Sequence, residues 1–182
     1  MTDINSQLKS SHAGRRRQDA TIAAAAEARV VAAVELLFFA YRDFTSDPDA
    51  ILSEYGFGRA HHRVLHFVAR YPGLRVADLL DILKITKQSL SRVLKQLIAD
   101  GYVEQRSGKS DRRERLLFVS TTGFELARRL LAPQIARVGA ALESEGNAAG
   151  VEAFLLALVS TQERNRVRAL LDRRRRNGGD RR

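Results

Sequence analysis

The stretch "TKQSLSRVLKQLIADGYVEQRSGKSDRRERLLFVSTTG" occupies residues 86–123 and combines one helix pattern with two short strand patterns. The helix pattern starts after Thr86, a residue type that caps helix N-termini, and it ends at "DG" (100–101). Its apolar stripe consists of Leu90, Val93, Leu94 and Leu97. The segments "YVEQR" (102–106) and "RLLFVS" (115–120) read as strands on either side of a charged loop, which predicts a β-hairpin.

A short amphipathic helix is predicted directly before this stretch. Residues 76–83 carry apolar side chains at i, i+3, i+4 and i+7, and only three residues separate this segment from Lys87. Two helices joined so closely must cross at a steep angle, which is the helix-turn-helix arrangement. A further helix is predicted over 58–71, where "YPG" ends it. A hairpin directly after a helix-turn-helix is a wing, so the sequence predicts a winged helix-turn-helix.

The outward face of the helix that follows Thr86 bears no acidic side chain. Lysine and arginine contact phosphates or guanine edges, glutamine can pair with adenine, and serine allows a close approach of the helix. A solvated helix face that is polar by chance is the alternative interpretation. We predict a DNA-recognition helix that uses Thr86, Lys87, Gln88, Ser89, Ser91, Arg92 and Lys95.

The wing resembles that of the MarR-type winged-helix transcription regulators. The D-x-R element of that family reads Asp111-Arg112-Arg113 here. Its Leu-x-Leu-Thr-x-x-Gly run reads "LFVSTTG" at 117–123, with valine for the second leucine and serine for the threonine. The resemblance covers about residues 57–123, and residues 36–73 are most similar to the alphaproteobacterial PetP and LdtR subgroup.

The resemblance implies a mainly α fold with a small β-hairpin wing, in which the winged helix-turn-helix is flanked by N- and C-terminal dimerisation helices. It also implies that the helix behind Thr86 reads the major groove, that Asp111 pairs with Arg113, and that an arginine at the wing tip enters the minor groove. A narrow, A·T-rich minor groove attracts such a guanidinium. We therefore predict wing contacts to DNA from Lys109, Asp111, Arg112 and Arg113.

Arg75 departs from the family pattern, because a small hydroxyl residue usually caps the third helix at this position. Arginine weakens that cap, but it is a predicted phosphate contact.

The flanking helices carry more apolar surface than one small winged domain can cover. Apolar residues recur at helical spacing over 23–44 until "TSDPDA" breaks the pattern, again over 122–145 with Pro133 as a kink or break, and in a last helix from Val151. Partner helices from a second copy are predicted, and an intramolecular bundle in a monomer is the alternative. The predicted organisation is a polar, disordered N-terminal arm (1–22), an N-terminal dimerisation helix and connection (23–56), the winged helix-turn-helix DNA-binding domain (57–120), C-terminal dimerisation helices (121–172) and an Arg-rich disordered tail (173–182).

Composition limits the possible function classes. The 182 residues carry a net charge of +10, which favours a polyanionic partner, and residues 163–182 hold nine arginines against three acids. The absence of cysteine excludes disulfides and thiolate metal sites. No apolar run has the length of a membrane helix, no signal peptide is recognisable, and no phosphate loop or placed nucleophile indicates an enzyme. We therefore expect a cytoplasmic protein that is neither an enzyme nor a membrane protein.

A small-molecule effector is implied by the resemblance, because the family often binds small anionic or aromatic compounds between its dimer helices and its winged domain. Phe39, Arg42, His62 and His66 are the candidates to line such a cleft. His62 and His66 also have a spacing that suits a shared metal, but the sequence offers no further ligand at a recognisable spacing, so neither a metal nor a cofactor is predicted.

The predicted function is a sequence-specific, double-stranded DNA-binding transcription regulator, acting as a repressor and binding a palindromic operator as a homodimer in a bacterial cell. The alternative is an architectural or RNA-binding protein that uses the wing and the Arg-rich tail for non-specific backbone contacts.

Overall fold

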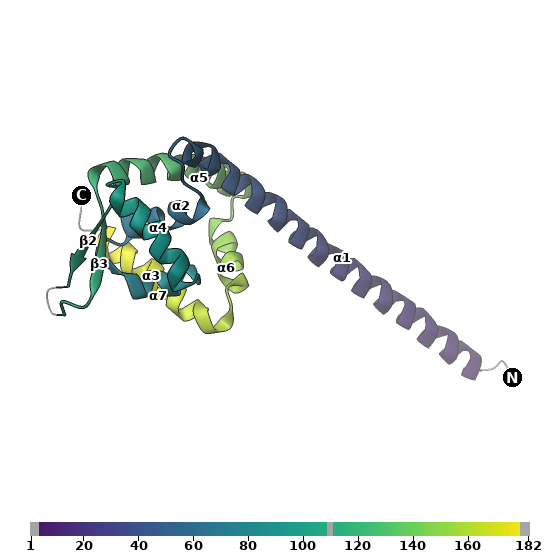
Figure 1. Cartoon of the computed structure of the whole chain (residues 1–182). Coiled ribbons are helices and arrows are strands. Elements are labelled where there is room, and N and C mark those ends of the chain that lie inside the picture. The colour runs from purple at the N-terminus through teal and green to yellow at the C-terminus, as the bar shows by residue number, and fades with distance from the viewer. Residues whose placement is uncertain (1–3, 109–110, 179–182) are drawn as a thin grey trace. The chain divides into compact units, whose positions relative to one another are not determined.

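The computed structural model describes residues 4–108 and 111–178, with side chains described for residues 18–108 and 111–173 (Figure 1). Two compact units, residues 1–44 and 45–182, are described each by itself. The predicted fold class, mainly α with a small β-sheet wing, is confirmed. In chain order the elements are α1 (Ile4–Ser53), α2 (Arg59–Arg70), β1 (Leu74–Arg75), α3 (Val76–Leu83), α4 (Lys87–Ala99), β2 (Val103–Ser107), β3 (Arg115–Val119), α5 (Thr121–Glu145), α6 (Ala148–Leu158) and α7 (Thr161–Gly178).

Helix α1 is longer than predicted at both ends. It begins at Ile4, within the segment 1–22 that we expected to be disordered, and it continues through "TSDPDA" to Ser53. Proline inside a helix costs one backbone hydrogen bond. Pro48 is fully buried and Leu52 is buried one turn later, so packing in the core of the second unit offsets that cost. Helix-forming alanines in "IAAAAEARVVAA" favour the extension on the N-terminal side.

The first unit exposes a broad apolar surface on α1. None of residues 18–44 is buried in the single chain. Burial of apolar area stabilises a protein by roughly 25 cal/mol per Å², so such a surface favours a covering partner. The exposed large apolar side chains are Ile22, Val30, Val31, Val34, Leu36, Leu37, Phe38, Phe39, Tyr41 and Phe44.

The winged helix-turn-helix forms the core of the second unit. Helix α2 lies at its centre and contacts α4, α5 and β3. The predicted helices over 58–71, 76–83 and from Thr86 are present within one or two residues of their expected ends. The core brings together Leu52, Phe57, Val64, Leu65, Val68, Leu74, Leu79, Leu83, Leu90, Val93, Leu94, Leu97, Val103, Leu117, Leu126, Ala127 and Leu130.

The wing belongs to a three-stranded antiparallel sheet with the order β1-β3-β2. Leu117 on the central strand pairs with Leu74 of β1 and with Gln105 of β2, and its side chain is 0% exposed. Strand β1 has only two residues, too few for a periodic pattern, and the sequence did not predict it. Strand β3 is therefore hydrogen-bonded along both edges, and its Leu117 side chain packs in the core.

The segment after β3 is hydrogen-bonded to the turn that follows α4. The Ser120 hydroxyl donates to the Gly101 carbonyl (2.7 Å) and accepts from the Gly123 N–H (3.0 Å), which caps α5. The Gly123 backbone lies so close to Tyr102 that an added Cβ would be 2.0 Å from the Tyr102 carbonyl oxygen. Only glycine allows α5 to start this close to the turn between α4 and β2.

The C-terminal helices differ from the prediction in three respects. Pro133 lies inside a single helix α5, so the helix is not split there, which was one of the two expected outcomes. Two helices follow instead of one, because α6 ends at Leu158, where the Arg164 guanidinium donates to the Ala157 (2.9 Å) and Val159 (3.0 Å) carbonyls. Helix α7 continues to Gly178, so most of the predicted disordered tail is helical, while residues 179–182 lie outside the described part.

We expect Gly123→Ala to lower the free energy of unfolding by about 1–3 kcal/mol, because the new methyl group overlaps the Tyr102 carbonyl. Gly139→Ala is the matched control on α5, since an added Cβ there meets no atom within 4 Å. It should stabilise the helix by about 0.5–1 kcal/mol. Urea unfolding followed by circular dichroism measures both, and equal effects of the two substitutions would refute the close approach at Gly123.

Candidate nucleic-acid interface

The start of α4 is defined by Thr86. Its Oγ1 accepts from the Ser89 N–H (3.1 Å) and its hydroxyl donates to the Ser89 Oγ (2.8 Å). Lys84 ends α3 in the left-handed conformation (φ 50°), which completes the turn between the two helices. Thr86 and Ser89, both predicted to contact DNA, are thus engaged in fixing the N-terminus of α4.

The two faces of α4 separate as predicted. The side chains of the apolar stripe are buried, whereas the opposite face is exposed and, among the residues that the structure describes, its lysines and arginine form no ion pair. The face is cationic and without a carboxylate, so a polyanion can approach it without displacing an internal partner. The exposed predicted residues are Lys87, Gln88, Ser91, Arg92 and Lys95.

The wing tip is shaped by Asp111. Its Oδ1 accepts a hydrogen bond from the Arg113 backbone N–H (2.8 Å), and its carbonyl accepts from the Glu114 N–H (3.1 Å). The predicted pairing of Asp111 with Arg113 is thus made by the backbone of Arg113 and not by its guanidinium. Asp111 orients the turn, which leaves the side chains of Arg112 and Arg113 exposed. Lys109 lies outside the described residues.

Arg75 joins the helix-turn-helix to the wing. Its guanidinium donates to both carboxylate oxygens of Asp78 on α3 (2.8 and 2.7 Å) and to Glu114 at the wing (3.2 Å). Arg75 occupies the N-cap position of α3, and its side chain makes no capping hydrogen bond, as expected for an arginine in place of a hydroxyl residue. The hydrogen bond from Arg75 lowers the pKa of Asp78. A phosphate contact by Arg75 therefore stays a prediction, and it requires sharing a guanidinium that already holds two carboxylates.

A cation over an aromatic ring stiffens the wing, and the sequence did not predict it. The Arg106 guanidinium lies 4.6 Å from the centroid of the Phe118 ring across the β2–β3 pair and also binds Glu104 (2.7 Å). In the strand register Phe118 is opposite Glu104 and Arg106 is opposite Leu116, so Arg106 and Phe118 are diagonal neighbours on one face of the sheet.

The predicted effector residues fall into the two separately described units. On α1, the Arg42 guanidinium lies 5.2 Å from the Phe39 ring centroid and binds Asp43 (2.8 Å). On α2, the rings of His62 and His66 meet edge to face with their centroids 6.4 Å apart, and burial lowers the pKa of His62. Their role in ligand binding stays a prediction. Within residues 4–108 and 111–178, no cluster of three or more His, Cys, Asp and Glu side chains is placed to hold a metal.

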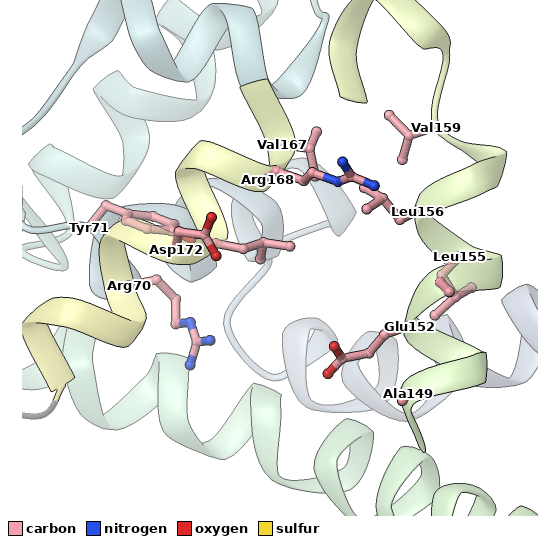
Figure 2. Close-up of a pocket in the computed structure, with 12 residues that line it drawn as sticks. Arg70, Tyr71, Ala149, Glu152, Leu155, Leu156, Val159, Val167, Arg168 and Asp172 are labelled. Atoms are coloured by element: carbon pink, nitrogen blue, oxygen red, sulfur yellow. The ribbon is translucent and has the colours of Figure 1, made fainter. Parts of the chain in front are cut away.

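A cavity of about 950 Å³ lies between the end of α2, α6 and α7, and no sequence pattern pointed to it (Figure 2). Tyr71 and Asp172 lie on one side of it, and Leu155 and Leu156 of α6 line the other side together with Val159, the residue after α6. Burial raises the pKa of Tyr71.

Comparison with known proteins identifies the family. Residues 55–114 match the model of the MarR family. The HTH-type transcriptional regulator PetP of Rhodobacter capsulatus is 46% identical over 141 residues, which cover 76% of this chain and 85% of that protein. The chain belongs to the MarR family. As a MarR-family member it is a DNA-binding transcription regulator and not an enzyme.

Solved structures show the same fold. The MarR family transcription regulator SP03579 superposes with a TM-score of 0.60 at 19% identity, covering 80% of this chain and 93% of that one. NadR in complex with 4-hydroxyphenylacetate gives 0.59 at 21% identity, covering 68% and 91%. In the part of this chain that the structure describes, no helix has the length and apolar character to cross a membrane.

We expect Arg75→Ala to raise the pKa of Asp78 toward its ordinary value of about 3.9, because the largest cause of its lowering is the hydrogen bond from Arg75. A carboxylate whose pKa is lower in the folded state than in the unfolded state stabilises the protein. This contribution is fully present above the unfolded-state pKa and is lost as the pH falls through the folded-state pKa. The variant should therefore lose stability at neutral pH and show a weaker pH dependence in the acid range. NMR titration of the carboxyl groups measures the change in the pKa of Asp78, and Arg115→Ala on β3 is the control. An unchanged pKa of Asp78 in Arg75→Ala would contradict the hydrogen bond between Arg75 and Asp78.

Proposed function

We propose that this MarR-family regulator binds a palindromic double-stranded operator as a homodimer, acts as a repressor in the cytoplasm of a bacterial cell, and responds to a small anionic or aromatic effector. The observation that carries the proposal is the acid-free, exposed face of α4 next to a wing whose tip arginines are exposed. An α-helix fits the major groove of B-DNA, and an exposed guanidinium on a hairpin fits the minor groove.

Direct base reading is assigned to the exposed face of α4. Gln88 can make a bidentate contact with adenine, and Arg92 or the lysines can contact guanine O6 and N7. Thr86 and Ser89 contribute by fixing the helix N-terminus, where backbone N–H groups can meet a phosphate. The wing contributes Arg112 and Arg113, together with Lys109 and the turn-forming Asp111.

A homodimer is supported by the apolar side chains that a single chain leaves uncovered. Besides α1, these side chains lie on α5 and α6, where α6 has no buried residue at all. Two-fold symmetry would place two copies of α4 about one helical turn of DNA apart, which matches a palindrome. The exposed large apolar residues of α5 and α6 are Phe124, Ile135, Val138, Phe154, Leu155 and Leu158.

An effector is supported by the family and by the chemistry of the predicted residues. NadR, which has a similar fold, was solved in complex with 4-hydroxyphenylacetate, an aromatic anion. In this chain Phe39 offers a ring and Arg42 a cation, while His62 and His66 offer ring nitrogens. We assign these four residues to an effector site of the assembled dimer.

We expect the protein to prefer its operator over unrelated DNA by about 10³-fold or more at fixed salt, because base contacts add to the phosphate contacts. Operator fragments can be selected from the host genome and their affinities measured by fluorescence anisotropy, with a scrambled duplex of equal length as control. Equal affinity for both duplexes would favour an architectural protein, and tighter binding of RNA would favour an RNA-binding one. Either result would overturn the proposed function.

We expect Arg113→Ala to weaken operator binding by about 1–3 kcal/mol while leaving the dimer intact, because the exposed guanidinium is assigned to the minor groove. Arg128→Ala removes the same charge from an exposed position on α5 and serves as the control. Sedimentation verifies the oligomeric state of both variants. Wild-type affinity of Arg113→Ala would remove the role assigned to this arginine.

A further inference from the structure

Helix α7 is docked antiparallel along α3 by two ion pairs. Near its start, Glu163 accepts from the Lys84 ammonium at the end of α3 (3.0 Å). One turn later, the Arg166 guanidinium donates to Asp81, one turn back along α3 (2.7 Å). Each step toward the C-terminus of α7 is thus a step toward the N-terminus of α3.

This direction carries α7 toward the wing. A cavity of about 560 Å³ between α7 and the helix-turn-helix is lined at one end by Leu74, Arg75 and Asp78, and Leu170 and Arg173 of α7 line the same cavity. Arg173 therefore reaches the level of β1 and the start of α3, where Arg75 connects to Glu114 of the wing. Figure 1 shows α7 passing α3 toward the sheet.

The carboxylates of this surface already have cationic partners. Arg75 holds Asp78 and Glu114, and Arg166 holds Asp81. The chain nevertheless continues from Arg173 with three more arginines before Asn177. The acids of the docking surface have partners, and Arg173, which lines the same cavity as Arg75, begins a run of four arginines in the sequence next to the proposed DNA-binding wing.

We propose that the arginine run 173–176 is a second, sequence-independent DNA contact, which binds backbone phosphates next to the wing on the same operator. The inference rests on the proposed function and adds a partner for the C-terminal segment. Guanidinium groups pair with phosphate oxygens in a bidentate manner, and each neutralised phosphate releases condensed counterions. The contact adds affinity without selecting a base sequence.

The test replaces all four arginines by glutamine in the full-length protein and measures Kd against salt concentration, for the selected operator and for a scrambled duplex. One phosphate contact per protomer of a dimer adds about 2 to the magnitude of the negative slope of log Kobs against log[salt]. We expect the slope to fall by about 2 or more, and the affinity for both duplexes to fall by the same factor. Unchanged slopes and affinities would overturn the inference.

Two further variants separate a placed contact from general charge. Lysine at the same four positions keeps the charge and should restore the slope, so a lysine variant as weak as the glutamine variant would contradict the account. Arg168→Gln removes one charge from the same helix at the cavity between α6 and α7, and should leave the slope unchanged. An equal loss per charge at Arg168 would also overturn it. If the wild-type protein does not discriminate operator from scrambled DNA, the proposed function fails first.

Discussion

The burial of Leu117 in the central strand of the small sheet is the constraint on which the proposed DNA-binding surface depends. This side chain is fully enclosed, and its strand is paired on both edges, with β1 before the helix-turn-helix and with β2 after the recognition helix. The wing is therefore attached to both helices of the motif. Ser120 and Gly123 complete the attachment, because they hold the start of α5 against the turn that ends α4. A rigid relation between α4 and the wing lets one protein surface fit two grooves of a duplex at once.

Charge is distributed over this frame in a consistent way. Near the wing, Arg75 engages Asp78 and Glu114, and Arg106 engages Glu104. The exposed face of α4 and the tip arginines have no carboxylate partner among the described residues. Asp111 is the exception in the loop, and it acts on the backbone by accepting from the Arg113 N–H. The proposed contact with DNA accounts for the arginines of the loop, and Asp111 supplies the local acceptor that the turn needs.

The sequence predicted the parts of the fold that repeat along the chain. Periodic apolar residues located α3 and α4, Thr86 located the start of α4, and two short strand patterns on either side of a charged loop located the hairpin. It missed features that depend on contacts between distant residues. Strand β1 exists because Leu117 pairs with Leu74, and Pro48 stays helical because the core covers it. Helix α7 is attached to α3 by Glu163 and Arg166, and it continues past residue 173. In the candidate interface, the exposed residues of α4 were predictable from the helical period. Three contacts were not predictable, because they follow from turn geometry and from strand register. They are the hydrogen bond of Asp111 to a backbone N–H, the hydrogen bonds of Arg75 to two carboxylates, and the stacking of Arg106 on an aromatic ring.

In the proposed complex, α4 enters the major groove while the wing enters the adjacent minor groove. Methylation interference on the selected operator tests it most directly, because dimethyl sulfate modifies guanine N7 in the major groove and adenine N3 in the minor groove. We predict interference by guanine N7 at two half-sites about one helical turn apart, with interference by adenine N3 in the minor groove beside each of them. Binding that tolerates methylation of both atoms throughout the site would contradict it.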